Sequence, residues 1–127
     1  MKKRLYPRDD FEATVVIYSE AEGGRRTPVR NGIRWDLAYA DDDPADTNYM
    51  IWPDFFSYLD GSPLPADSLP IGVPLVGRFV ILNDDIRRDV HQARISVGTR
   101  FYCRTGSRRV AAGTVTRVTG LHDPIST

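Results

Sequence analysis

The sequence predicts an all-β fold, either a closed antiparallel barrel or a sandwich, and three observations favour it. Apolar and polar residues alternate along several segments, glycine and proline separate these segments, and helical periodicity is weak. Many short strands punctuated by turn residues are typical of both architectures. A length of 127 residues suits one domain with one core. We therefore expect residues 1–127 to form a single unit, with loose tails at 1–9 and 120–127.

Two early segments show the alternation of half-buried strands. In residues 11–18 and 33–39, apolar side chains occupy every odd position. Gly23 and Gly24 lie in the polar loop between them and can adopt the positive φ angles of a tight turn. The interior predicted from these strands and from two later positions contains Phe11, Val15, Ile17, Ile33, Trp35, Leu37, Phe101 and Val118.

The middle of the chain, residues 41–74, contains six of the nine prolines and is expected to be a long irregular insert. Its apolar patch at 49–59 is too hydrophobic for a disordered linker, and Pro53–Leu59 is a candidate short helix. The patch either packs over an open barrel end or forms a protein interface. We expect the patch to do both. Phe55 or Trp52 packs in the core, and Tyr58 binds a partner together with a neighbouring acid, Asp54 or Asp60. The interface candidates are Trp52, Phe55, Phe56, Tyr58 and Asp60.

The last third of the sequence predicts four further strands, near 75–82, 93–97, 100–104 and 109–118, and a short helix at 84–92. Cys103 lies inside the third of these strands. We expect its side chain to face the core as a small apolar group. Because it is the only cysteine, no internal disulfide can form, which favours a reducing, cytoplasmic location.

Charge is balanced overall but segregated along the chain. The 17 basic and 17 acidic residues give a net charge of zero, yet no Lys or Arg lies between Trp35 and Gly77, where eight Asp occur. No apolar run is long enough to span a membrane, and the charged N-terminus is not followed by a signal-peptide core. These patterns indicate a soluble protein with an acidic middle between two basic flanks.

Two blocks of sequence resemble a known family. The first runs from Phe11-Glu12-Ala13 through Glu22-Gly23-Gly24-Arg25-Arg26-Thr27-Pro28 to Gly32-Ile33-Arg34. The second runs from Arg100-Phe101 through Arg104, Gly106 and Arg108 to Ala112-Gly113 and Val115. Together they are similar to the third, C-terminal barrel of bacterial elongation factor Tu and cover about half of the chain.

This resemblance implies a closed six-stranded antiparallel barrel that contacts the backbone of transfer RNA. Positions matching the loop Arg25-Arg26 and the turn Thr105-Gly106 lie near the RNA in the family, and Arg108 follows that turn. Asp36 stands where the family usually has Gln, and its carboxylate would repel phosphate. The sequence also has no G-x-x-x-x-G-K-[ST] loop, so we expect no bound nucleotide and no GTPase activity.

Signatures of catalysis and metal binding are sparse. One Cys and two His are too few for an obvious structural zinc site. A triad of His91 and Asp89 with Ser96 or Ser107 can be written down, but no G-x-S-x-G motif supports it. We therefore expect no catalytic residues, no metal and no cofactor.

Three functions remain open from the sequence. The first is a stand-alone, non-catalytic module that binds a protein, acting as a mimic or decoy of the elongation factor. The second is an RNA-contacting accessory of translation, and the third is a hydrolase with an unrecognised site. The sequence indicates neither the partner nor the oligomeric state.

Overall fold

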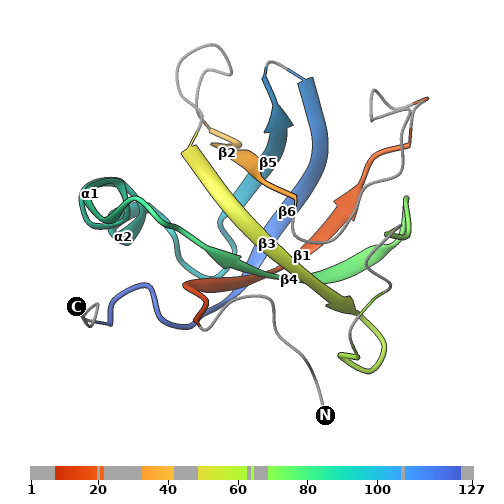
Figure 1. Ribbon diagram of the computed structural model, residues 1–127, viewed down its shortest axis with the longest axis horizontal. Helices are drawn as coiled ribbons and strands as arrows, with labels where there is room; N and C mark the ends of the chain where they lie inside the picture. The colour runs from red at the N-terminus through yellow and green to blue at the C-terminus, as the bar shows by residue number, and fades with distance from the viewer. Residues whose placement is uncertain are drawn as a thin grey trace.

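The barrel predicted from the sequence is present. The computed structural model describes residues 8–19, 21, 33–41, 49–62, 64, 69–106 and 108–123. Its strands pair antiparallel in the closed order β1-β4-β3-β2-β5-β6, which confirms the all-β, six-stranded barrel (Figure 1). The strands are β1 (Phe11–Ile17), β2 (Trp35–Tyr39), β3 (Tyr49–Ser57), β4 (Pro74–Val80), β5 (Arg100–Thr105) and β6 (Arg108–Val118).

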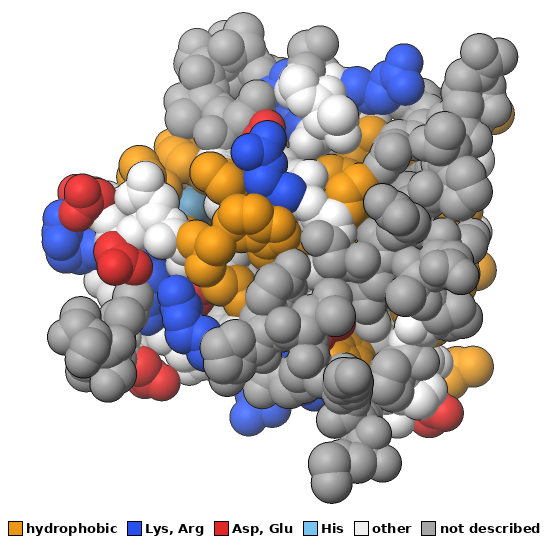
Figure 2. All heavy atoms as spheres, in the orientation of Figure 1, with side chains coloured by type: hydrophobic (Ala, Val, Ile, Leu, Met, Phe, Trp, Pro, Cys, Tyr) orange, Lys and Arg blue, Asp and Glu red, His pale blue; other side chains and the backbone are white. Residues whose placement is uncertain are grey.

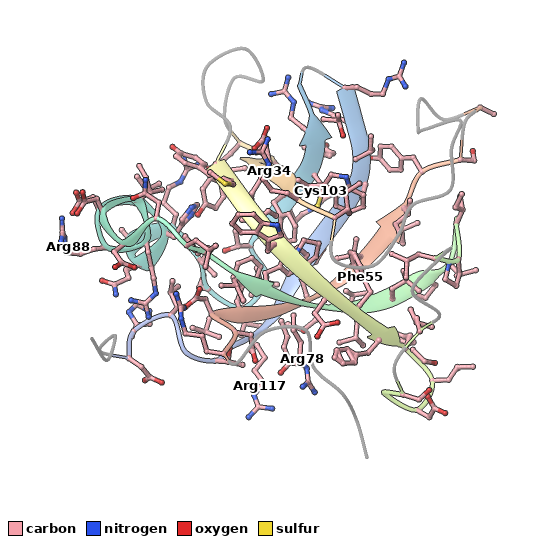
Figure 3. The ribbon with its side chains drawn as sticks, viewed as in Figure 1. Arg34, Phe55, Arg78, Arg88, Cys103 and Arg117 are labelled. Atoms are coloured by element: carbon pink, nitrogen blue, oxygen red, sulfur yellow. The ribbon has the colours of Figure 1, made fainter. Side chains whose placement is uncertain are left out.

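The interior follows the predicted alternation. Odd-numbered side chains of β1 are buried and the even-numbered ones between them are half-buried, as every second position of a strand faces the same side. Six of the eight predicted core residues are fully buried, and Ile33 and Val118 are partly buried against the core. Cys103 lies inside the barrel, as predicted, and so does Phe55 (Figure 3).

Aromatic rings fill the barrel and press against glycine backbone. Phe11 stacks on Phe79 at 4.9 Å between ring centroids, and Phe101 meets Phe79 edge-on at 5.5 Å. A Cβ at Gly77 would lie 2.6 Å from the Phe79 ring, and one at Gly113 would lie 2.4 Å from the Phe101 ring. These strand glycines are therefore required by close packing.

The expected irregular insert at 41–74 is wrong over its central part, because β3 is a nine-residue strand of the barrel. The expected helix at Pro53–Leu59 is wrong for the same reason. Beyond Ile51 the described register of β3 has only β4 as a neighbour. Pro53, which has no N–H to donate, lies in this part of β3, where the described pairing is with β4 alone.

A helical segment occupies 84–94 and replaces the strand expected at 93–97. It consists of α1 (Asp84–Ile86), the π-helical turn η2 (Arg87–His91) and α2 (Gln92–Arg94), so the helix predicted at 84–92 is present. Asn83 caps its start by accepting a hydrogen bond from the Ile86 N–H at 3.0 Å. Beyond the helix, Ile95 is buried while Val97 is exposed. The two apolar side chains therefore do not share a buried face, as they would in the strand expected at 93–97.

A buried carboxylate joins the helical segment and the end of the chain to the barrel. Asp10 is fully buried and accepts hydrogen bonds from Arg87 Nε at 3.0 Å, Arg8 Nη1 at 2.7 Å and the Ile81 N–H at 2.7 Å. The guanidinium of Arg87 also donates to the carbonyls of Gly120 and Asp123. The described parts of the expected loose tails, residues 8–9 and 120–123, are thus bound to the barrel, and residues 1–7 and 124–127 lie outside the described residues.

Replacing Asp10 by Asn tests this arrangement. We expect a loss of about 3–5 kcal/mol in the free energy of unfolding, because Arg87 would keep its burial but lose its counter-charge. Asp85→Asn is the matched control, since the exposed Asp85 pairs with the exposed Arg88, and such pairs contribute at most about 1 kcal/mol. Denaturant titration measures both, and equal midpoints for the two variants would contradict a structural role of the buried pair.

Candidate functional site

The turn after β3 presents a group of exposed apolar side chains. Leu59 is 93% exposed and Tyr58 is 54% exposed. Ile71 and Val73, which precede β4, are also exposed. Ser57 pairs with Leu75 across β3 and β4, so both segments leave the barrel at the same end. We call Tyr58, Leu59 and Asp60, which follow one another on the turn after β3, the apolar tip.

Hydrogen bonds fix the backbone of this turn. The Ser57 N–H donates to the Ser62 carbonyl at 2.8 Å, and the Gly61 N–H donates to the Ser57 carbonyl at 2.8 Å. Asp60 accepts from the N–H of Ser62 at 2.9 Å and from its hydroxyl at 2.6 Å. These bonds from Ser62 hold the pKa of the Asp60 carboxyl below its ordinary value. The tip therefore carries a constant negative charge beside its apolar side chains near neutral pH.

A space-filling view shows this charge pattern. Hydrophobic and acidic side chains project together at the lower right corner, where β3 ends (Figure 2). Over the helical segment at the left, acidic and basic side chains alternate instead. There Arg88 is paired with Asp85 and Asp89, whereas among the described residues no ion pair involves Asp60 of the tip.

The structure separates the predicted aromatic interface into two groups. Phe55 points into the barrel and contacts the Trp35 and Phe79 rings edge-on. Phe56 is 1% exposed under the guanidinium of Arg78, 4.7 Å from the ring centroid, and Trp52 is half-buried. Phe55 and Phe56 thus cannot form an exposed surface, which corrects their placement in an interface. Tyr58 and Asp60 are exposed, as their expected role in binding a partner requires.

The β5–β6 turn holds three of the five predicted RNA-contacting residues. Thr105, Gly106 and Arg108 are exposed, and Gly106 has a φ of 60°, which favours glycine. Next to the turn, Arg109 lies over the Tyr102 ring at 3.9 Å. Asp36 faces Arg104 across β2 and β5. Arg25 and Arg26 lie outside the described residues, so they are not placed relative to this turn.

His91 is the most perturbed titratable group with a polar partner. It is fully buried, its Nδ1 shares a hydrogen bond with the Tyr39 hydroxyl, and its Nε2 has no hydrogen-bond partner among the residues that the structure describes. The Tyr49 ring meets the imidazole edge-on at 4.9 Å. Burial lowers the pKa of His91 to about 4, with a smaller upward effect of Asp10 and a smaller downward effect of Arg94. His91 is therefore neutral at pH 7.

The candidate triad is not assembled among the described residues. His91 contacts Tyr39, Asp89 binds Arg88 and is exposed, and Ser96 bonds to Thr99. Ser107 lies outside the described residues. Burial raises the pKa of the Cys103 thiol, which keeps it protonated. Within the described part of the chain, no group of three or more His, Cys, Asp or Glu is arranged to hold a metal ion.

Comparison with models of known protein families finds no match to this chain. Within the described ranges, no helix combines the length and apolar character needed to cross a membrane.

Two features of the structure were not predicted from the sequence, one at the surface and one buried. Leu59, Ile71 and Val73 were not selected because single apolar residues near prolines resemble ordinary loop residues. The Tyr39–His91 contact joins residues 52 positions apart. Its only sequence signal is that Tyr39 follows Leu37 in the inward alternation of β2, which indicates that its hydroxyl needs a buried partner.

The pKa of His91 predicts a pH-dependent stability. An unfolded His titrates near 6.5, so between pH 6.5 and about 4 the unfolded chain binds more protons than the folded one. The contribution of His91 is complete above pH 6.5 and is lost as the pH falls to about 4. It corresponds to roughly 3 kcal/mol.

The measurement is the free energy of unfolding between pH 7.5 and pH 4 for His91→Phe and the wild type. The variant should show a flatter pH dependence because Phe does not titrate. His122→Gln is the control, since His122 is exposed, and it should follow the wild type. Parallel curves for wild type and His91→Phe would refute the depressed pKa.

Proposed function

We propose that this protein is a non-catalytic binding module that recognises a protein partner through the apolar tip. The observation that carries the proposal is the exposure of Leu59 and Tyr58 on a hydrogen-bonded turn. Contiguous exposed apolar side chains with a polar rim are typical of interaction sites. Because the turn is already ordered, little conformational entropy is lost on binding.

The charge around the tip favours one class of partner. Asp60 lies on the turn, and the sequence from Asp36 to Val76 contains no Lys or Arg. The matching surface would be an apolar socket rimmed by basic side chains. The resemblance to the C-terminal barrel of elongation factor Tu supports a partner that normally recognises that factor, with this chain acting as a mimic or decoy.

A non-catalytic role agrees with the state of the titratable groups. His91, the natural candidate for a general base, is buried and hydrogen-bonded to Tyr39 instead of a nucleophile. The Cys103 thiol is fully buried inside the barrel. These arrangements support binding over hydrolysis.

The proposal predicts that Leu59→Asp abolishes partner capture while the fold is retained. Immobilised protein would be incubated with a lysate of its host, and captured proteins compared by quantitative mass spectrometry. Val97→Asp is the matched control, since Val97 is 69% exposed at a different part of the surface. Partners lost with Leu59→Asp and Asp60→Lys but kept with Val97→Asp are specific to the tip.

Competition tests the mimicry. An excess of full-length elongation factor Tu should displace these partners if both proteins use one binding site. Sedimentation measures whether the tip mediates self-association instead. Identical partners for wild type, Leu59→Asp and Asp60→Lys would remove the tip as the interface.

A second candidate function is RNA binding through β5 and β6. Residues 95–121 contain five Arg and no Asp or Glu, and the Arg109–Tyr102 pair offers a cation over an aromatic face. Guanidinium groups along β5 and β6 can bind the phosphates of RNA. Such contacts do not depend on the base sequence of the RNA.

The RNA alternative predicts binding of transfer RNA that weakens steeply with salt. Replacing Arg25 and Arg26, or Arg108 and Arg109, by Gln should reduce the log–log salt slope by about 1–2 units, one for each lost phosphate contact. Arg88→Gln is the control because Arg88 is paired with acidic neighbours. Absence of a mobility shift at low salt would exclude this alternative.

A further inference from the structure

The outer face of the sheet formed by β1, β6 and β5 carries a shallow groove. These three strands lie side by side in the barrel (Figure 1). Ala112 of β6 is paired with Val16 of β1 on one side and with Tyr102 of β5 on the other. A small side chain thus stands between two larger ones, and all three line a cavity of about 230 Å³. Sites for drug-sized molecules measure about 300–1,000 Å³, so this cavity suits a single ring of a larger molecule.

One face of the Tyr102 ring borders this cavity. Arg109 lies over the ring, with its guanidinium carbon 3.9 Å from the ring centroid. Arg109 is paired with Arg104, which lies two residues closer to the β5–β6 turn than Tyr102. The cavity instead borders the pair of Arg100 and Thr114, which lies on the other side of Tyr102 along the strands. The guanidinium and the cavity therefore lie on opposite sides of the ring.

Polar side chains line the end of the cavity that is farther from the turn. Thr114 is paired with Arg100 on one side and with Thr14 on the other, so the three form one row across the strands. All three line the cavity. None of the three side chains has a hydrogen-bond or ion-pair partner among the residues that the structure describes. The row therefore offers two hydroxyl groups and one guanidinium to a ligand beside the Tyr102 ring.

The charges of this face favour a nucleic acid as the ligand. Residues 95–121 contain five Arg and no Asp or Glu, and within the described chain no ion pair involves Arg100, Arg108 or Arg109. Single-stranded nucleic acids bind to surfaces that combine cations, which attract the backbone, with aromatic rings on which bases stack. In a duplex the bases are stacked on one another, so only an unpaired base can enter the cavity.

We propose that this groove binds single-stranded RNA and holds one unpaired base in the cavity, stacked on Tyr102. Arg109 covers the other face of the ring, so guanidinium, phenol ring and base form one stack. Arg100 and the hydroxyl groups of Thr14 and Thr114 contact the ribose and phosphate of the same nucleotide. The inference rests on the second candidate function, RNA binding through β5 and β6, and adds a contact to a base. It is independent of the apolar tip.

The test compares two single-stranded probes of equal length by fluorescence anisotropy at low salt. One is an oligouridine, and the other is a ribose-phosphate chain without bases. Both carry the same backbone charge, so the difference between their dissociation constants measures the contact to the bases. We expect the oligouridine to bind about tenfold more tightly than the chain without bases. An RNA duplex is the third probe.

Three variants locate the base. Tyr102→Leu should weaken the binding of oligouridine about tenfold and leave the binding of the other two probes unchanged, whereas Tyr102→Phe, which keeps the ring, should bind as the wild type does. Ala112→Leu fills the cavity and retains Tyr102 and Arg100. It should lower the affinity for oligouridine to that for the chain without bases. Tyr58→Leu is the matched control, since it removes an exposed tyrosine at the apolar tip, and it should have no effect.

The outcomes separate this inference from the function on which it rests. Equal affinity of the wild type for the two single strands would overturn the position of the base, and so would unchanged oligouridine binding in Tyr102→Leu. In both cases the second candidate function would stand on its phosphate contacts. Absence of binding to all three probes would remove that function and the inference together. Circular dichroism checks the fold of each variant, and if Ala112→Leu is unfolded, the comparison of Tyr102→Leu with Tyr102→Phe decides.

Discussion

The buried ion pair between Asp10 and Arg87 fixes one end of the molecule. Its carboxylate also accepts from the Ile81 N–H, so the helical segment is joined to the end of β4. Burying two charges is costly unless each is fully hydrogen-bonded. Arg8, Gly120 and Asp123 supply the remaining bonds, which is why the segments on both sides of the barrel sequence are ordered around this pair.

The features next to the helical segment depend on the same anchor. With Arg87 held, the following residues place His91 at the Tyr39 hydroxyl and Arg94 over the Tyr39 ring. The buried imidazole and the place of Arg94 are therefore consequences of one helix position. By contrast, the apolar tip lies on the β3–β4 connection and is held by its own turn bonds, so it does not depend on the helical segment.

Alternation of apolar and polar residues predicted β1 and β2, and strands were also expected at β4, β5 and β6, although every one of these except β1 buries some neighbouring side chains as well. It failed for β3 because Pro53 and Asp54 interrupt the pattern, although both are buried in the structure. Had the strand been recognised, its period of two would have separated Phe55 from Phe56. Tyr58 and Asp60 were predicted as binding residues. The contact between Tyr39 and His91 joins residues far apart in the sequence, so no local pattern predicts it.

The glycine–aromatic contacts of the core give a physical meaning to the sequence block from Arg100-Phe101 to Gly113. Phe101 and Gly113 stand opposite each other on β5 and β6, and the ring occupies the space that a side chain at 113 would need. Phe55 and Gly77 stand opposite each other on β3 and β4, where a Cβ at 77 would lie 3.2 Å from the Phe55 ring and 2.6 Å from the Phe79 ring. Ring and glycine thus form one steric unit, so a side chain added at the glycine requires a smaller residue in place of the ring. A motif of this kind records the geometry of the barrel and is compatible with many different partners.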